Sequence, residues 1–212
     1  MNEVLDIQHA LRVHGYVRLA EPFDEGTFKA FVERLGRIVN VERIALRPGA
    51  HAYVAKPGPV PLHTDHPEAL FVAWLCIRQD DVDGASRLYD SQPFVQELSE
   101  GDREELRKTD LECPPLSGGP PSLRFPVLTQ SPSRETDEIF CSPWLRAAGA
   151  DPERQAVVDG FRERLKHDIQ ARSIEVRLGA GDVLVVDNRR VLHGRGKIEN
   201  GSKRELLRVW LR

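Results

Sequence analysis

The sequence predicts a mainly β protein whose sheet core is flanked by helices, and three observations support this fold class. Short apolar segments between residues 43 and 89 are separated by Gly and Pro, as in a series of short strands. Segment 70–77 is apolar on both faces, which is typical of a central buried strand. Amphipathic segments with helical spacing lie before and after this region. The 212 residues suit one domain, which we expect to span 1–212.

The first forty residues read as helix, strand and helix. An apolar stripe of Val4, Ile7 and Leu11 predicts the first helix, and residues 16–19 after Gly15 predict the strand. Asp24 is a good N-cap for the second helix. We expect that helix to bury one face made of Phe28, Phe31, Val32, Leu35, Ile38 and Val39.

Strands and a long irregular region follow. The strand candidates are 43–46, 52–55, 62–65, 70–77 and 86–89. A helical patch at 93–109 then leads into 113–126, whose five prolines exclude a helix or a central strand. We expect a loop or lid insertion at about 110–150, because long loops in compact domains are often functional.

The last third begins with a strong helix start and ends in strands. In Asp151-Pro152-Glu153 a capping residue, a first-turn proline and an acid at the positive end of the helix dipole occur together. The predicted helix runs to about Arg172. The predicted strands are 174–178, 182–187 and 205–212.

The composition limits the classes of partner. The 33 acidic residues nearly balance the 30 basic ones, so no chain-wide positive field favours nucleic acid. No apolar run approaches the roughly 20 residues that span a bilayer. The three cysteines have no paired spacing, and the N-terminus lacks the features of a signal peptide. We expect a cytoplasmic protein that binds a small molecule, with no nucleic-acid or membrane partner.

Two short motifs far apart in the sequence predict a metal site. In a strand, His63 and Asp65 of His63-Thr64-Asp65 point to the same side, because side chains alternate with period two. His193, near the end of the chain, is the candidate for a third ligand. Two histidines and one carboxylate on one side of an ion are the facial arrangement of non-haem Fe(II) oxygenases.

The last predicted strand places arginines beside this site. One of its faces carries Arg204 and Arg208, and the other is apolar. If the apolar face meets the outer helices, the arginines point inward, where an unpaired guanidinium is costly unless an anion binds it. An edge strand with its arginines in water explains this strand alone equally well. The nearby His193 favours the first interpretation.

These motifs together carry a family resemblance. HTD, DNRRVLHGR and the arginines of RELLRVW closely resemble the taurine dioxygenase/TfdA-like superfamily of Fe(II)- and 2-oxoglutarate-dependent oxygenases, especially its clavaminate synthase-like branch. The resemblance runs from about Tyr16 to the C-terminus, with residues 93–151 similar only in general layout. It implies a double-stranded β-helix, a jelly roll of the cupin-like kind, with a closed cavity.

The resemblance also implies the site residues. His63, Asp65 and His193 would hold Fe(II), and Arg204 with the hydroxyl of Ser86 would bind the distal carboxylate of 2-oxoglutarate. Arg208 would bind either that carboxylate or an anionic group of the substrate. With O2, such enzymes turn 2-oxoglutarate into succinate and CO2 while they oxidise a C–H bond. Hydroxylation of a small amino-acid-like or carboxylate metabolite, in natural-product tailoring or catabolism, is the expected outcome.

Some residues carry weaker predictions. His66 follows the metal motif and Arg124 lies in the irregular region; each could contact substrate, or serve a cap or surface role instead. Trp144 could recognise substrate or stack on the surface. His51 and Tyr53, on the predicted strand before the site, read as core or rim packing.

Two other function classes fit part of the pattern. A zinc-dependent hydrolase could use the same His/Asp/His set, although it leaves Arg204 and Arg208 unexplained. A non-catalytic binding module of the same fold is the other alternative, and the intact triad argues against it. The chain is shorter than most relatives, which leaves a homodimer or a partner-completed site open.

Overall fold

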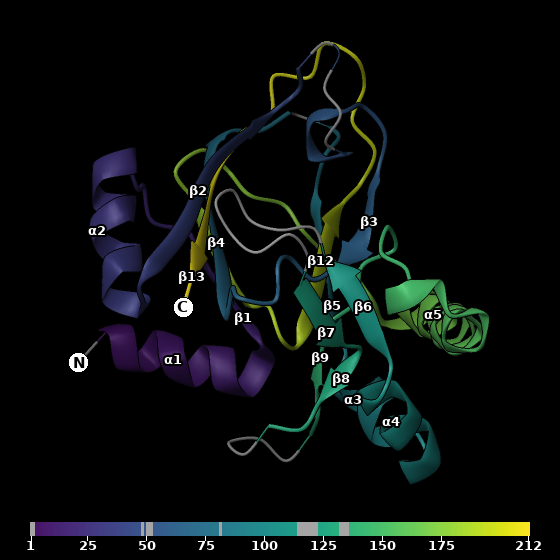
Figure 1. Cartoon of the computed structure of the whole chain (residues 1–212). Helices are drawn as coiled ribbons and strands as arrows, with labels where there is room; N and C mark the ends of the chain where they lie inside the picture. The colour runs from purple at the N-terminus through teal and green to yellow at the C-terminus, as the bar shows by residue number, and fades with distance from the viewer. Residues whose placement is uncertain (1–2, 48, 50–52, 81, 114–122, 132–135) are drawn as a thin grey trace.

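The computed structural model describes residues 3–47, 49, 53–80, 82–113, 123–131 and 136–212, and its centre is a pair of antiparallel sheets (Figure 1). The larger sheet has the order β1-β11-β4-β13-β2, and the smaller β10-β5-β12-β3. The larger sheet consists of β1 (Tyr16–Leu19), β2 (Ile38–Ala45), β4 (Phe71–Arg78), β11 (Val183–Asp187) and β13 (Glu205–Leu211). The smaller consists of β3 (Val60–His63), β5 (Ser86–Asp90), β10 (Ile174–Val176) and β12 (Val191–Arg195). The expected double-stranded β-helix is confirmed.

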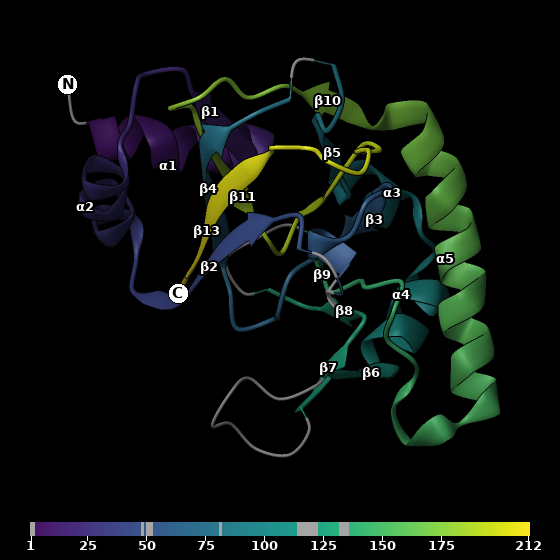
Figure 2. The same cartoon turned by 90° about the horizontal axis from the view of Figure 1, so that it is seen from above.

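Helices cover the outer faces of both sheets. The larger sheet is flanked by α1 (Glu3–His14) and α2 (Glu25–Leu35), and the smaller by α3 (Gln92–Glu97), α4 (Glu100–Arg107) and α5 (Pro152–Arg172) (Figure 2). The cap predicted for α5 is present, because the Asp151 carboxylate accepts hydrogen bonds from the amides of Glu153 and Arg154. The capping box of α2, between Asp24 and Thr27, is present as well.

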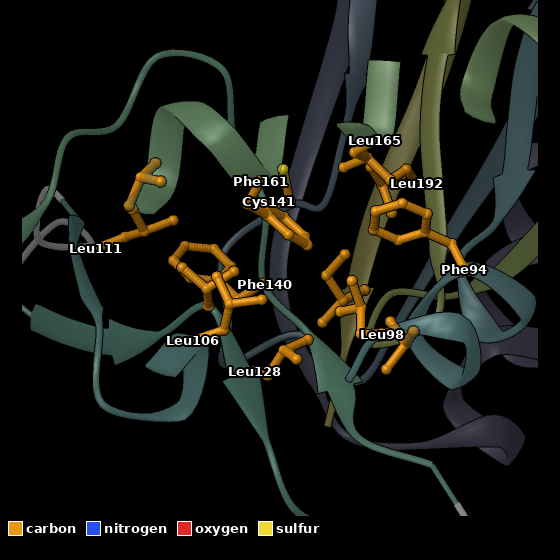
Figure 3. Packing of buried hydrophobic residues seen from close by; sticks show 14 of the residues in the cluster. Phe94, Leu98, Leu106, Leu111, Leu128, Phe140, Cys141, Phe161, Leu165 and Leu192 are labelled. Atoms are coloured by element: carbon orange, nitrogen blue, oxygen red, sulfur yellow. The ribbon is translucent and has the colours of Figure 1, made fainter. Parts of the chain in front are cut away.

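Apolar side chains form three layers, one between the sheets and one under each set of helices. Phe28, Phe31 and Val32 of α2 pack with the outward side chains of the larger sheet. Beneath α3, α4 and α5, Phe94, Phe161 and Leu192 join a second outer layer (Figure 3). Full burial of such side chains contributes roughly 1.5–3 kcal/mol each. The inner layer contains Trp74, Leu88, Leu184 and Leu206 from both sheets.

β13 alternates as its sequence predicts. Leu207, Val209 and Leu211 pack in the layer under α1 and α2. Arg204 is 5% exposed and Arg208 7% exposed, and both line a cavity between the sheets. The alternative of an edge strand with arginines in water is therefore wrong. β13 lies between β4 and β2, so both of its edges are paired.

Four sequence predictions need correction. The second helix ends at Leu35, because residues 38–45 pair with β13 as β2 instead of extending the helix. Tyr53–Ala55 is a 3-10 turn and not a strand, while residue 52 lies outside the described residues. The predicted strand 62–65 ends earlier, at His63. The helical patch at 93–109 is two helices, with Ser99 capping the second.

The irregular region holds more structure than its prolines suggest. β6 (Asp110–Cys113) pairs with β7 (Leu123–Pro126), and β8 (Leu128–Thr129) with β9 (Glu138–Ile139). The prediction that all of 113–126 is loop is therefore wrong at both ends, although Pro126 ends its strand in a separate two-stranded sheet. A second 3-10 turn, Ala148–Ala150, precedes α5. Within the described residues, no helix has the length and apolar character to cross a membrane.

Candidate active site

The two histidines of the predicted metal site come from neighbouring strands. β3 and β12 run antiparallel, and His63 and His193 are direct partners across the pair. β12 is a strand that the sequence did not predict. A β-bulge between His193 and Arg195 shifts the register beyond this pair, and Gly194 leaves room for it, since a Cβ there would lie 2.4 Å from the Val60 carbonyl oxygen.

Asp65 lies just past the end of β3, where side-chain hydrogen bonds fix its backbone. The backbone amide of Asp65 donates to the side-chain Oδ1 of Asn188 at 2.8 Å. The side-chain Nδ2 of Asn188 in turn donates to the backbone carbonyl of Ala69 at 2.9 Å. Thr64 is tied to Cys141 on both sides, because its hydroxyl accepts from the Cys141 amide at 3.0 Å and donates to the Cys141 carbonyl at 3.2 Å. The turn thus brings Asp65 beside the histidines without a strand at that residue.

The three side chains form one compact, buried cluster. Their candidate ligand atoms all lie within 4.8 Å of one another. The Nε2 atom of His63 lies 3.7 Å from the Asp65 carboxylate, and that of His193 lies 3.4 Å from it. Trp144 packs edge-on against the His63 ring, with 4.8 Å between centroids, and Trp74 does the same to His193.

The protonation of this cluster suits a divalent cation. The His63 Nδ1 atom lies 2.9 Å from the Pro61 carbonyl, which can only accept, so Nδ1 carries a hydrogen and Nε2 is the nitrogen that faces the cluster. Both ring nitrogens of His193 are buried without a hydrogen-bond partner among the described residues, and burial lowers the pKa of this histidine. Burial would raise the pKa of Asp65, but Arg208 and the two histidines hold it well below its usual range. Two imidazoles, with that of His193 favoured in its neutral form, therefore converge with an ionised carboxylate.

Arg208 is already paired in the structure. Its Nη1 donates to both Asp65 oxygens, at 2.8 and 3.0 Å, and its Nη2 donates to Glu42 at 2.5 Å. The Trp210 indole donates a further hydrogen bond to Asp65 at 2.9 Å, and the Arg208 guanidinium lies 5.0 Å from the Trp210 ring centroid. These contacts fix the orientation of the Asp65 carboxylate.

Arg204 has a different environment. Among the described residues, its side chain makes one long hydrogen bond of 3.5 Å, from Nη2 to the Ser86 hydroxyl, and its Nε is buried without a partner. Burial lowers the pKa of this guanidinium to about 10. The cavity that it lines also borders on Ser86, His193 and Arg208. A buried cation that lacks an acidic partner within the described part of the chain is a receptor for an anion.

Comparison with known proteins fits this geometry. Residues 2–210 match the model of the taurine catabolism dioxygenase TauD, TfdA family. The chain belongs to this family. The expected enzyme class, an Fe(II)/2-oxoglutarate-dependent oxygenase that uses O2, is the class of this family, and that expectation is confirmed. Among curated proteins, none matches the sequence significantly.

Several solved structures share the fold of this TauD/TfdA-family chain. An asparagine oxygenase in complex with Fe(II), 2S,3S-3-hydroxyasparagine and succinate is 21% identical with a TM-score of 0.76, covering 98% of this chain and 78% of its own. The non-heme iron oxygenase OrfP in complex with Fe and alpha-ketoglutaric acid is 18% identical with a TM-score of 0.74, covering 100% and 80%. The PvcB protein from Pseudomonas aeruginosa is 20% identical with a TM-score of 0.70, covering 100% and 80%.

Of the weaker sequence candidates, one is buried next to the cluster. His66 is buried next to the cluster and stacks on Trp210, with 5.9 Å between centroids. Its Nδ1 accepts from the Glu68 amide, so Nε2 carries a hydrogen, and that nitrogen has no partner among the described residues. Arg124 is exposed on β7, where it pairs with Glu112 of β6, and its role in substrate binding stays a prediction. His51 lies outside the described residues, as does the Tyr53 side chain.

The sequence did not single out three residues that belong to this site. Glu42 was missed because the strand that places it opposite Arg208 was read partly as helix. Trp210 lies two residues after Arg208, so alternation along the strand puts it on the same face, and its indole nitrogen was the available signal. Arg195 is buried beside the cavity and donates to the carbonyls of Gly58 and Lys56. Burial, and then the charge of Arg204, lower its pKa to about 10.

Proposed function

We propose that this TauD/TfdA-family protein hydroxylates a C–H bond of a small amino-acid-like or carboxylate metabolite, with Fe(II), 2-oxoglutarate and O2, and releases succinate and CO2. One observation carries the proposal. His193 of the buried His/Asp/His cluster lines the same cavity as Arg204, a buried cation without an acidic partner among the described residues. A metal on the triad and a carboxylate on Arg204 would satisfy both, and 2-oxoglutarate can supply the carboxylate.

The residues divide between the two ligands. His63, Asp65 and His193 would hold Fe(II), leaving the other side of the ion for co-substrate and O2. Arg204 would bind the distal carboxylate of 2-oxoglutarate through its unpaired donors, with Ser86 donating beside it. Arg208 is assigned to Asp65 and to the substrate side, because two carboxylates already engage it.

The protein supplies orientation and a dry environment for the reaction. When bound, iron with 2-oxoglutarate and O2 supplies the oxidant for an unactivated C–H bond. Trp74, Leu88 and Leu184 line the cavity and exclude water from it. Arg208 and Trp210 hold the Asp65 carboxylate in one orientation, and the hydrogen bond from Nδ1 of His63 to Pro61 keeps Nε2 directed at the site.

The substrate class is inferred from the polar groups beside the cluster. Arg208 offers a cation there, and His66 offers a buried Nε2–H donor. Two of the similar structures hold hydroxylated amino acids, 2S,3S-3-hydroxyasparagine in the asparagine oxygenase and (3S)-hydroxy-L-Arg in OrfP. These observations support a small polar metabolite. We also propose a cytoplasmic location, which the three free cysteines Cys76, Cys113 and Cys141 support.

An anaerobic titration tests the proposal. Adding 2-oxoglutarate to the Fe(II)-loaded protein under argon should produce a weak visible charge-transfer band. Admitting O2 together with a panel of amino acids and carboxylates should then release succinate, and mass spectrometry should find a product 16 Da heavier. No band, together with tight zinc binding and cleavage of an ester, would identify a zinc hydrolase. A band without succinate from any member of the panel would identify a non-catalytic binding module.

A further inference from the structure

The segment that follows β9 contacts the proposed iron site at two points. The Cys141 carbonyl accepts from the Thr64 amide at 2.8 Å, and the Cys141 amide donates to the Thr64 hydroxyl at 3.0 Å, so this backbone runs beside the turn between two proposed ligands. Three residues later, the half-buried Trp144 packs edge-on against the His63 imidazole, with 4.8 Å between centroids and 70° between planes. The segment therefore contacts both the backbone and a ligand side chain of the site.

One guanidinium from helix α5 holds the turn that carries Trp144. The Nη2 of Arg162 donates to the carbonyl oxygens of Ser142 at 2.5 Å and of Leu145 at 2.6 Å, which are the two ends of this turn. The Leu145 amide closes the same turn with a longer bond of 3.4 Å to the Ser142 carbonyl. Hydrogen bonds from a charged donor are stronger than those from a neutral amide. Arg162 therefore contributes more to the 142–145 turn than the turn's own backbone bond does.

The carbonyls of this turn are the main polar partners of Arg162. Its one acidic neighbour among the described residues is Asp159, at 3.8 Å from Nη1, and its Nε is buried without a partner there. The Arg162 side chain is 20% exposed, and the adjacent Phe161 packs with Cys141 in the apolar layer beneath α5 (Figure 3). Polar and apolar contacts together thus tie the middle of α5 to the segment that carries Trp144.

The His63 ring needs more than one contact to keep a single orientation. Its Nδ1 lies 2.9 Å from the Pro61 carbonyl, but one hydrogen bond leaves the ring free to tilt about the line of that bond. The rings of Trp144 and His193, with centroids 4.8 and 4.9 Å away, restrict this tilt. Contacts that orient a metal ligand in this way typically contribute roughly 10- to 100-fold to metal affinity.

We propose that Arg162 is a positioning residue for the iron site, which acts from the outer helix through the 142–145 turn and Trp144 on the orientation of the His63 ring. The inference rests on the metal-binding role proposed for His63 and extends it to a residue of α5. Without the guanidinium, the Ser142 and Leu145 carbonyls lose their charged donor and the turn relaxes. Trp144 then no longer restricts the tilt of the imidazole, and the direction of Nε2 is no longer fixed.

A Co(II) titration under argon tests this role, because the visible absorption of bound Co(II) reports both affinity and ligand geometry without turnover. Arg162→Met and Trp144→Leu should each weaken Co(II) binding about 10-fold and change the absorption spectrum in the same way. The double variant should bind no more weakly than Trp144→Leu alone, because the two residues act in series. Trp144→Phe keeps a ring at this position and should restore most of the affinity.

Arg164→Met is the matched control, because Arg164 also belongs to α5 but donates to Asp102 of α4. It should leave the Co(II) affinity and spectrum unchanged. The proposal is overturned if Arg162→Met binds Co(II) as this control does, or if the two losses add in the double variant. Should Arg162→Met fail to fold by circular dichroism, wild-type affinity in Trp144→Leu overturns it alone. A wild-type protein that binds neither Co(II) nor Fe(II) would remove the proposed function as well, whereas tight wild-type binding leaves that function standing.

Discussion

Arg204 and Arg208 lie on the same face of the same end of the chain, yet they have opposite surroundings. Arg208 donates to two carboxylates, those of Asp65 and Glu42. Arg204 has one long contact to Ser86, and no acidic side chain bonds to it among the residues described. Both are buried to a similar degree. The direction in which an arginine side chain points therefore does not define its role. The groups that it bonds to define that role.

This difference divides the cavity into two parts. At the Arg208 end, positive charge is already neutralised, and a ligand must exchange with an existing partner. At the Arg204 end, no anion among the described residues offsets the desolvation cost of the guanidinium. A carboxylate that binds there therefore forms a new ion pair without displacing an existing partner. A dicarboxylate co-substrate fits the Arg204 end, and the substrate fits the Arg208 end.

Removing Asp65 should have the largest effect, because the residue serves both as a proposed ligand and as the partner of Arg208. Asp65→Ala should abolish Fe(II) binding and succinate release. Metal analysis of the reconstituted protein and a succinate assay check this. Asp137→Ala is the control, since it removes another buried carboxylate, paired with Arg107, without contact to the triad. Iron binding by the Asp65 variant equal to that of the control would contradict the assignment.

A substitution that crowds the Arg204 side chain should selectively weaken the binding of 2-oxoglutarate. Gly84 has a φ of +77°, and a Cβ there would lie 2.8 Å from Cδ of Arg204. We expect Gly84→Ala to raise the 2-oxoglutarate concentration at half-saturation about 10-fold or more, with strain of roughly 1–2 kcal/mol. Gly201→Ala introduces similar strain at a φ of +87° with nothing within 4 Å. Equal 2-oxoglutarate requirements in the two variants would show that Arg204 is not displaced.

The Thr64 hydroxyl should affect iron affinity rather than 2-oxoglutarate affinity. Thr64→Val leaves the Cys141 amide unsatisfied and loosens the turn between His63 and Asp65. An effect of about 10-fold on Fe(II) affinity is expected, because residues that orient ligands typically contribute 10- to 100-fold. Thr64→Ser should restore it. Thr109→Val removes another buried hydroxyl, bonded to the Glu105 carbonyl in α4, and should leave iron affinity unchanged.

Removing the Ser86 hydroxyl should have the smallest effect on the 2-oxoglutarate requirement. Its contact to Arg204 is long at 3.5 Å, so Ser86→Ala should raise the 2-oxoglutarate requirement only about 3- to 10-fold. Steady-state kinetics at saturating substrate measure this change. Ser91→Ala, which loses a hydrogen bond to the Arg190 carbonyl, is the control. A larger effect from Ser86 than from the Gly84 variant would reverse the proposed ranking at this end of the cavity.

The sequence predicted those parts of the site that local patterns determine. Alternation along β13 correctly placed Arg204 and Arg208 inside, and the cap at Asp151 correctly began α5. The partners of the two arginines could not be predicted in this way, because they depend on strand register. Glu42 meets Arg208 only through the pairing of β2 with β13, and residues 38–39 also fit the helical spacing before them.

Asp65 lies beside His63 as expected, but the strand that was predicted to place it there is not present at residue 65. A strand through residues 62–65 was predicted to direct His63 and Asp65 to one side, but β3 ends at His63. Asn188 and Cys141, both distant in sequence, hold the turn that presents Asp65. Likewise, β12 was not recognised, although its Gly194 permits the close approach of β3. Long-range hydrogen bonds of this kind have no local signal.

A 2-oxoglutarate titration of two variants tests most directly whether Arg204, and not Arg208, binds the co-substrate. Fe(II)-saturated Arg204→Met and Arg208→Met proteins are compared with wild type under argon through the visible charge-transfer band. Loss of a buried charged partner costs roughly 2–5 kcal/mol, so Arg204→Met should need about 100-fold more 2-oxoglutarate. Arg208→Met should stay within several-fold of wild type. Near wild-type binding in Arg204→Met together with a large loss in Arg208→Met would contradict the assignment of the co-substrate to Arg204.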